Sequence, residues 1–320
     1  MIDKPKFVVP GDEPAQIQGS VHLKRLESYG SIDVFTDRPK SMDEQLARAE
    51  GAQVIINTRG AIKWYEDALR ALPELKMIAT CSIGVDMIDI PVAHELGIVV
   101  SNQPGRTAPV VAEHIIGLMF ATAKRTAYQT AELKAGRWGT MPNVHIQGKT
   151  LGVIGTGNVG REVARIANSI GMRCLAWTYN PSPQRAAELG VEFVELDQLL
   201  RESDVVSLHV RLSDESREMI GARELALMKP GAILINAGRG ELVATDALVD
   251  SLNSGHLAGA GLDVFDNEPL PHDHPILTCE QVVLTPHIAD QTPEGIELLN
   301  EGAVSNVIAF LDGRPQNVVL

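Results

Sequence analysis

The chain has 320 residues, a formal net charge of −13 and 44% hydrophobic residues. That length exceeds one ordinary domain, so two domains of about 100 to 200 residues each are expected. The acidic charge is spread over the whole sequence without a basic stripe, which argues against nucleic acid and anionic membranes as partners.

The cysteines and the apolar runs narrow the class of protein further. Cys81, Cys174 and Cys279 are an odd number without metal-ligand spacing, so the sequence predicts neither a disulfide framework nor a metal site. The first five residues lack the charged-then-apolar pattern of a signal peptide, and no apolar run approaches the ~18 residues of a membrane span. We therefore expect a cytoplasmic protein.

The first hundred residues alternate short apolar runs with helical patterns, which predicts parallel βαβ units. The expected strands are residues 7–9, 32–35, 54–56, 77–79 and 98–100. Loops at the carboxyl ends of such strands are where a doubly wound sheet binds ligands. In one of them, small residues around Ile83 and Gly84 would leave backbone N–H groups for a carboxylate, but an ordinary turn fits the same residues equally well.

A proline–glycine loop at residues 102–106 then opens a long helical pattern from about 108 to 124. Such a loop at the end of a sheet is typical of a crossing between domains. Residues 127–146 follow, with Trp138 and Met141 among polar residues and without a βαβ pattern. This insertion is either an arm that a partner subunit covers or a surface loop.

Three glycines spaced G-x-G-x-x-G organise the second half of the chain. A short apolar run precedes them and helix-period apolar residues follow at once, which indicates a phosphate-binding turn. Gly155 permits the bend, Gly157 lets a pyrophosphate approach the backbone, and Gly160 lets the helix lie close to the strand. The start of the helix, including Asn158 and Val159, presents N–H groups to the anion.

A second βαβ series follows, with expected strands at 151–154, 174–177, 191–194, 205–209, 232–235, 260–264 and 282–284. A last helical pattern at 293–311 is long enough to return to the first domain. We therefore expect an α/β protein with two doubly wound parallel-sheet domains. A dinucleotide-binding (Rossmann) domain of residues 102–288 would be inserted into a flavodoxin-like substrate domain of residues 1–101 and 289–320.

Three loops after the glycine turn place a charged or polar residue at the carboxyl end of a strand: Arg239, Glu268 and His287. Singly, each has a structural explanation, as a solvated loop arginine, a capping or surface acid, and a core histidine bonded to backbone. Together they fit one reaction. A guanidinium binds a carboxylate and polarises the adjacent carbonyl, a histidine exchanges the hydroxyl proton, and a carboxylate holds that histidine as imidazolium. Hydride transfer belongs to the cofactor.

These loops and the glycine turn lie among further motifs, at residues 100–105, 111–114, 204–209, 228–232, 261–269 and 285–287. In this order and spacing, from about Asn57 to the C-terminus, the sequence resembles the D-isomer-specific 2-hydroxyacid dehydrogenases. The resemblance implies that Arg239 binds the substrate carboxylate, that His287 is the acid/base and that Glu268 is its partner.

The same resemblance implies further contacts. Asp263 would contact the nicotinamide carboxamide, Ala237 would lie at the nucleotide, and the backbone at Ile83 and Gly84 would complete the carboxylate site. Two subunits would pair through the nucleotide domain and its arm, which implies a homodimer.

One departure from the pattern concerns the cofactor. No carboxylate stands at the strand end where the ribose 2′-hydroxyl would be bound. Thr178 is there instead, either as a neutral strand end or, with Asn180 and Arg211, as part of a 2′-phosphate site, since arginine suits phosphate. Arg185 is also near in sequence. We hypothesise that NADP is at least accepted beside NAD.

The sequence therefore predicts an oxidoreductase that transfers a hydride between NAD(P) and a small 2-keto or D-2-hydroxy acid, such as glyoxylate or hydroxypyruvate. The alternative is an NAD(H)-sensing scaffold like the corepressors of the same family. The lack of long disordered tails disfavours that alternative, but the catalytic residues alone do not exclude it.

Overall fold

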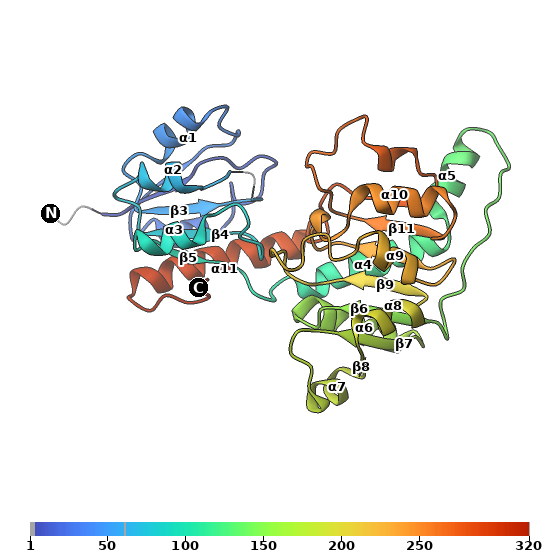
Figure 1. Cartoon of the computed structure of the whole chain (residues 1–320). Coiled ribbons are helices and arrows are strands. Elements are labelled where there is room, and N and C mark those ends of the chain that lie inside the picture. The colour runs from blue at the N-terminus through green and yellow to red at the C-terminus, as the bar shows by residue number, and fades with distance from the viewer. Residues whose placement is uncertain (1–3, 61, 320) are drawn as a thin grey trace. The chain divides into compact units, whose positions relative to one another are not determined.

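The computed structural model describes residues 4–60 and 62–319, and the chain divides into two compact units (Figure 1). One unit runs up to Thr107 and resumes at Gln291, and the other is Ala108–Asp290. The divisions fall a few residues beyond the boundaries expected from the sequence. Each unit is built on its own parallel sheet, so both are α/β.

The first unit contains a five-stranded sheet of order β2-β1-β3-β4-β5, in which every neighbouring pair is parallel. Its strands are β1 (Lys6–Val9), β2 (Ser31–Val34), β3 (Val54–Asn57), β4 (Met77–Thr80) and β5 (Val99–Ser101). The order is that of a flavodoxin-like sheet. All residues of β3 and β4 are buried, which explains their unbroken apolar runs.

Helices cover both faces of this sheet: α1 (Met42–Ala49), α2 (Glu66–Arg70), α3 (Ile90–Glu95), α11 (Pro293–Leu311) and the 3₁₀ helix η1 (Leu23–Leu26). The core clusters show α1, α2 and α3 on one face and α11 with η1 on the other. The helix expected at 293–311 thus forms with those bounds and belongs to this unit. Thr292 caps it, because its side chain accepts the Gly295 N–H.

The second unit contains a seven-stranded parallel sheet of order β12-β11-β10-β9-β6-β7-β8. Its strands are β6 (Thr150–Ile154), β7 (Arg173–Trp177), β8 (Glu192–Phe193), β9 (Val205–Leu208), β10 (Ile233–Asn236), β11 (Gly259–Leu262) and β12 (Val282–Leu284). Counted from β6, this is the Rossmann order, and the strand order reverses between β6 and β9. Such a reversal is where these sheets bind ligands.

The helices of this unit are α4 (Ala108–Ala123), α5 (Thr126–Lys134), α6 (Asn158–Ser169), α7 (Pro183–Leu189), α8 (Leu196–Glu202), α9 (Ala222–Leu227) and α10 (Thr245–Asn253), with the 3₁₀ helices η2 (Gly240–Leu242) and η3 (Pro275–Thr278). The core clusters place α4 and α6 on one face of the sheet and α8, α9 and α10 on the other.

The insertion after α4 differs from the expectation in one respect, because its first part is the helix α5. The sequence pattern does not predict a helix there, since α5 buries no residue and so carries no apolar period. Leu133 is 56% exposed and Trp138 is 88% exposed. Within the described chain, this segment therefore exposes apolar side chains to solvent.

Two expectations concern a membrane-spanning helix and a metal site. Among the described residues, no helix is long and apolar enough to cross a membrane. Nor does any group of three or more histidine, cysteine, aspartate or glutamate side chains in that part of the chain form a candidate metal site. The three cysteines are buried and are not joined in disulfides.

Candidate active site

The three glycines of the turn between β6 and α6 differ in backbone conformation and in the space around them. Gly155 has a φ of 95°, and a Cβ there would lie 2.8 Å from the backbone of His209. A Cβ on Gly160 would lie 2.0 Å from the carbonyl oxygen of Gly155, so the close packing of α6 on the turn requires this glycine. A Cβ on Gly157 would meet no atom within 4 Å. Gly157 therefore leaves open space on the turn.

The start of α6 suits an anion beside that space. The first N–H groups of an α-helix, here those of Asn158, Val159 and Gly160, have no acceptor within the helix. The N–H of Arg161 is the first to bond back, to the carbonyl oxygen of Gly157 at 3.0 Å. The N-terminal end of the helix dipole attracts negative charge at the same place. An open cradle beside these donors fits the pyrophosphate of a dinucleotide.

The residues expected to bind a 2′-phosphate lie on two different segments of the second unit. Thr178 and Asn180 follow β7, but Arg211 follows β9, and β6 lies between these two strands. The two strand ends are thus about 10 Å apart, at about 4.8 Å per strand, so Arg211 is carried by a separate segment and its part in a 2′-phosphate site stays a prediction. Arg185 of α7 contacts Asn180 and reaches back toward the glycine turn, where it contacts Thr156.

The contacts of Arg185 join the segment after β7 to that turn. One terminal nitrogen donates to the carbonyl oxygen of Asn180 at 2.6 Å. The other donates to the Thr156 hydroxyl at 2.7 Å and to its carbonyl oxygen at 3.0 Å. Sequence spacing alone does not reveal this contact, because it depends on α7 folding back over the turn.

The predicted catalytic residues follow β10, β11 and β12, which are neighbours in the sheet and parallel. Nδ1 of His287 lies 2.7 Å from Oε2 of Glu268. The other oxygen of this carboxylate accepts the Phe265 N–H at 3.0 Å, so its orientation is set by the backbone of its own loop. The His287 side chain is 48% exposed and that of Glu268 35%. The pair therefore remains open to a reactant.

Arg239 is carried by a loop that Asn236 shapes. The buried Asn236 amide donates to the carbonyl oxygen of Arg239 at 2.7 Å and accepts the Gly238 N–H at 3.0 Å. A Cβ on Gly240 would lie 1.9 Å from the backbone of Phe265, so this loop packs tightly against the loop that contains Glu268. Arg239 is thereby brought close enough to act electrostatically on both Glu268 and His287.

The charges within this group agree with the expected roles. The hydrogen bond that His287 donates to the Glu268 carboxylate raises the pKa of His287, against the opposing effects of burial and Arg239. Burial acts to raise the pKa of Glu268, but the hydrogen bond and charge of His287, with help from Arg239, outweigh it and the pKa is lowered. The arrangement favours an ionised carboxylate beside an imidazolium, which can donate a proton.

Asp263, which the resemblance places at the nicotinamide carboxamide, is held by neighbouring residues of the second unit, and its contact with the cofactor stays a prediction. Its side chain is fully buried. The two carboxylate oxygens accept the N–H groups of Ile288 and Ala289, at 3.0 and 2.9 Å, and one of them also accepts the Thr285 hydroxyl. The carboxylate therefore faces the backbone that follows His287. Ala237, also expected at the nucleotide, directly follows β10 and is partly buried.

The loop of Ile83 and Gly84 belongs to the other unit and follows β4. Its carbonyl groups have partners: Asn102 donates to the oxygen of Ile83 at 2.7 Å, and the Ser82 hydroxyl donates to that of Gly84 at 2.8 Å. The N–H groups of Ile83 and Gly84 make no backbone bond among the described residues. Of the two interpretations of this loop, the carboxylate site thus has the donors that it requires.

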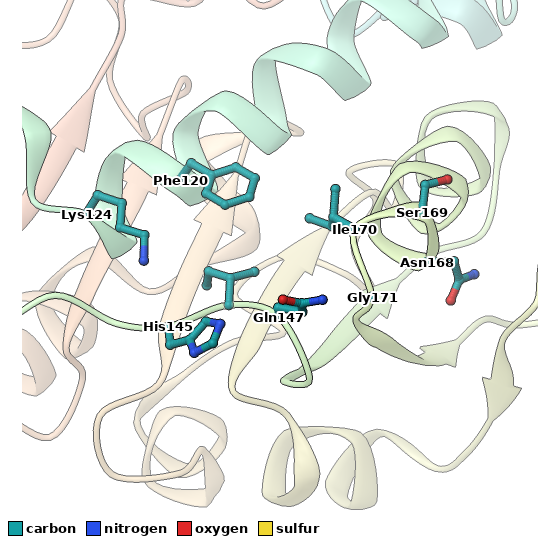
Figure 2. Close-up of a pocket in the computed structure, with 9 residues that line it drawn as sticks. Phe120, Lys124, His145, Gln147, Asn168, Ser169, Ile170 and Gly171 are labelled. Carbon is teal, nitrogen blue, oxygen red and sulfur yellow. The ribbon is translucent and has the colours of Figure 1, made fainter.

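A separate cavity of about 460 Å³ lies in the second unit, between the last turns of α4 and the end of α6 (Figure 2). Phe120 lies on α4 and Lys124 directly follows it, His145 and Gln147 come from the segment before β6, and residues 168–171 form the other side. None of these residues belongs to the predicted active site. The Lys124 ammonium is bonded to the carbonyl oxygen of Val144 at 2.8 Å.

Comparison with known proteins identifies relatives over nearly the whole chain. Residues 116–289 match the family described as D-isomer specific 2-hydroxyacid dehydrogenase, NAD binding domain. The glyoxylate reductase of Thermococcus litoralis is 37% identical over 93% of this chain and 92% of its own length. The hydroxypyruvate reductase of Thermotoga maritima is 42% identical over 77% of this chain and 83% of its own. A solved structure, acyclic imino acid reductase (Bsp5) with NADPH and D-Arg, has a TM-score of 0.89 and 28% identity, covering 98% of this chain and all of that one.

Proposed function

Because the chain belongs to the D-isomer specific 2-hydroxyacid dehydrogenase family, we propose that it reduces a small 2-keto acid, with glyoxylate and hydroxypyruvate as the first candidates. As a member of that family it is an oxidoreductase that uses NAD(P). The choice of keto acid rests on the names of the two relatives above. The observation that carries the proposal is the 2.7 Å contact between His287 and Glu268, with Arg239 close to both.

Each of the three side chains has a part in the reduction. When bound, the reduced nicotinamide supplies a hydride to the keto carbon. Arg239 binds the substrate carboxylate and draws electron density from the adjacent carbonyl. His287 donates a proton to the carbonyl oxygen as it becomes a hydroxyl, and Glu268 stabilises the imidazolium before that transfer. The participation of Ile83 and Gly84 in binding the carboxylate stays a prediction.

A panel of 2-keto acids, followed at the nicotinamide absorbance with NADH and with NADPH, tests this proposal. Turnover of glyoxylate or hydroxypyruvate that is lost in His287→Asn supports it. An enzyme that turns over no keto acid with either cofactor, yet binds both dinucleotides, would instead agree with the sensing scaffold, for which no comparison gives support.

We also propose that NADP is at least accepted and that Arg185, rather than Arg211, binds the 2′-phosphate. A guanidinium beside a strand end that carries Thr178 in place of a carboxylate is suited to that dianion. In Arg185→Gln we expect the Kd of NADPH to rise about tenfold, the value of one charge-assisted contact, while that of NADH stays within about twofold. Arg211→Gln is the matched control and should change neither. A KM for NADPH a hundredfold above that for NADH would refute this proposal.

The expected homodimer is likewise a proposal. Its support is the exposure of Leu133 and Trp138 on a segment whose helix buries nothing. Light scattering should give twice the 34.5 kDa chain mass for the wild type and a shift toward the single-chain mass for Trp138→Glu. A wild type of single-chain mass at micromolar concentration would contradict it.

A further inference from the structure

His287 has an unusual backbone conformation for its residue type. Its φ is 54°, in the left-handed region that side chains other than glycine seldom adopt. Such a conformation persists only where surrounding contacts hold it, and it often sets the direction of a functional side chain. The contacts that hold this turn therefore decide where the imidazole points.

The surrounding contacts come mainly from Asp263. Its carbonyl oxygen accepts the N–H of His287 at 2.8 Å. Its carboxylate oxygens accept the next two N–H groups, of Ile288 and Ala289. One residue thus binds three consecutive N–H groups, beginning at the histidine itself.

The carboxylate is in turn held by two side chains. The Thr285 hydroxyl donates to Oδ1 of Asp263 at 2.5 Å. Nε2 of His114, on α4, lies 3.0 Å from the same hydroxyl oxygen and 3.4 Å from Oδ1. A hydroxyl has one proton, and an ionised carboxylate can only accept, so His114 must be the donor to Thr285. These contacts place a proton on Nε2 of His114.

We propose that Asp263, Thr285 and His114 form a positioning network that maintains the left-handed turn at His287 and so keeps its imidazole against Glu268. The proposal rests on the proposed function of His287. In this network Asp263 orients the backbone that follows His287, because its fully buried carboxylate accepts backbone N–H groups there. Thr285 and His114 act through Asp263, so they should affect proton transfer rather than the affinity for the dinucleotide.

Thr285→Val is the main test, because valine keeps the shape of threonine but removes the hydroxyl. Oδ1 of Asp263 then loses the Thr285 donor, and the N–H of His114 loses its nearer acceptor and keeps only Oδ1 at 3.4 Å. We expect kcat to fall about 10- to 100-fold, the range for a displaced catalytic group. The Kd of NADH, followed by fluorescence, should stay within about twofold, since no contact to the cofactor is removed. Thr285→Ser restores a hydroxyl and should recover most of kcat.

A second pair of variants tests the outer residue. Glutamine can place an N–H donor near the position of Nε2, so His114→Gln should retain more activity than His114→Leu. All assays are run well below the unfolding temperature of each variant. Equal losses in Thr285→Val and Thr285→Ser, or a Kd of NADH that weakens as much as kcat falls, would overturn the proposal. So would a Thr285→Val variant with the kcat of the wild type.

An NMR titration of the His287 ring makes the test independent of turnover. Glu268 raises the pKa of this ring through a hydrogen bond that the turn maintains. In Thr285→Val the ring should therefore lose its proton at a lower pH than in the wild type, and Thr285→Ser should restore the wild-type midpoint. Failure of the proposed function would appear as an inactive wild type. Failure of the network would appear as an unchanged midpoint.

Discussion

The glycine turn allows a prediction that separates packing from ligand binding, because two of its glycines differ in what surrounds them. A methyl group on Gly160 would lie 2.0 Å from the carbonyl oxygen of Gly155 and 3.1 Å from its carbonyl carbon. Both of these atoms belong to the backbone, which cannot move aside as a flexible side chain can. A methyl group on Gly157 would meet nothing within 4 Å, and the φ of −70° at that residue suits any amino acid. Gly160→Ala should therefore reduce stability, whereas Gly157→Ala should reduce dinucleotide affinity.

The magnitudes follow from these contacts. Forcing a methyl group into a packed site costs about 1–3 kcal/mol, offset by up to about 1 kcal/mol from the better helix propensity of alanine. For Gly160→Ala a net loss of about 1–2 kcal/mol lowers Tm by about 2–8 °C in a domain of this size. Gly157→Ala changes only an N-cap, at about 0.5 kcal/mol. It does, however, obstruct the approach of an anion to N–H donors worth about 1.5–3 kcal/mol, so Kd should rise about 10- to 100-fold.

Differential scanning fluorimetry gives Tm for both variants, and fluorescence titration with NADH and NADPH gives Kd. Gly117→Ala is a control, since a Cβ at Gly117 would meet no atom within 4 Å and this residue lies in α4, outside the turn. The reasoning is refuted if Gly157→Ala loses as much Tm as Gly160→Ala, or if it binds both dinucleotides with wild-type affinity.

Three further predictions concern the reaction. Because Glu268 raises the pKa of His287, the protonated ring persists to higher pH, and reductive kcat should fall as pH rises through that pKa. Glu268→Gln should shift this fall to lower pH, while Glu192→Gln, which breaks a surface pair with Arg173, should not; identical pH profiles for all three enzymes would count against the assigned pair. His287→Asn should lower kcat by about 10²–10⁴ with unchanged Kd for NADH, and a near-normal kcat would exclude its role. Arg239→Lys keeps the charge but loses the planar fork, so KM for the keto acid should rise about 10- to 100-fold; a lysine variant with the wild-type KM would show that bidentate binding is not used.

The sequence alone predicts the strands of both sheets, and it predicts the pair of Glu268 and His287 that the structure brings together. Buried parallel strands produce continuous apolar runs, so β3, β4 and β10 were evident from composition alone. Arg239, Glu268 and His287 each follow a strand, and neighbouring parallel strands have their carboxyl ends at one edge of the sheet. The sequence therefore predicts that these three residues lie at the same edge. The sequence does not predict the helix α5, because a helix that buries no side chain has no apolar period.

Tertiary structure alone decided which side chains meet. Arg211 and Thr178 follow strands that are separated by β6, while Arg185 reaches the turn only because α7 folds back. Asp263 faces the backbone beyond His287, and His114 reaches it from a helix about 150 residues earlier in the chain. Local patterns report burial and period, which are properties of one segment. Hydrogen bonds between distant segments depend on strand order and loop direction, and those exist only once the chain has folded.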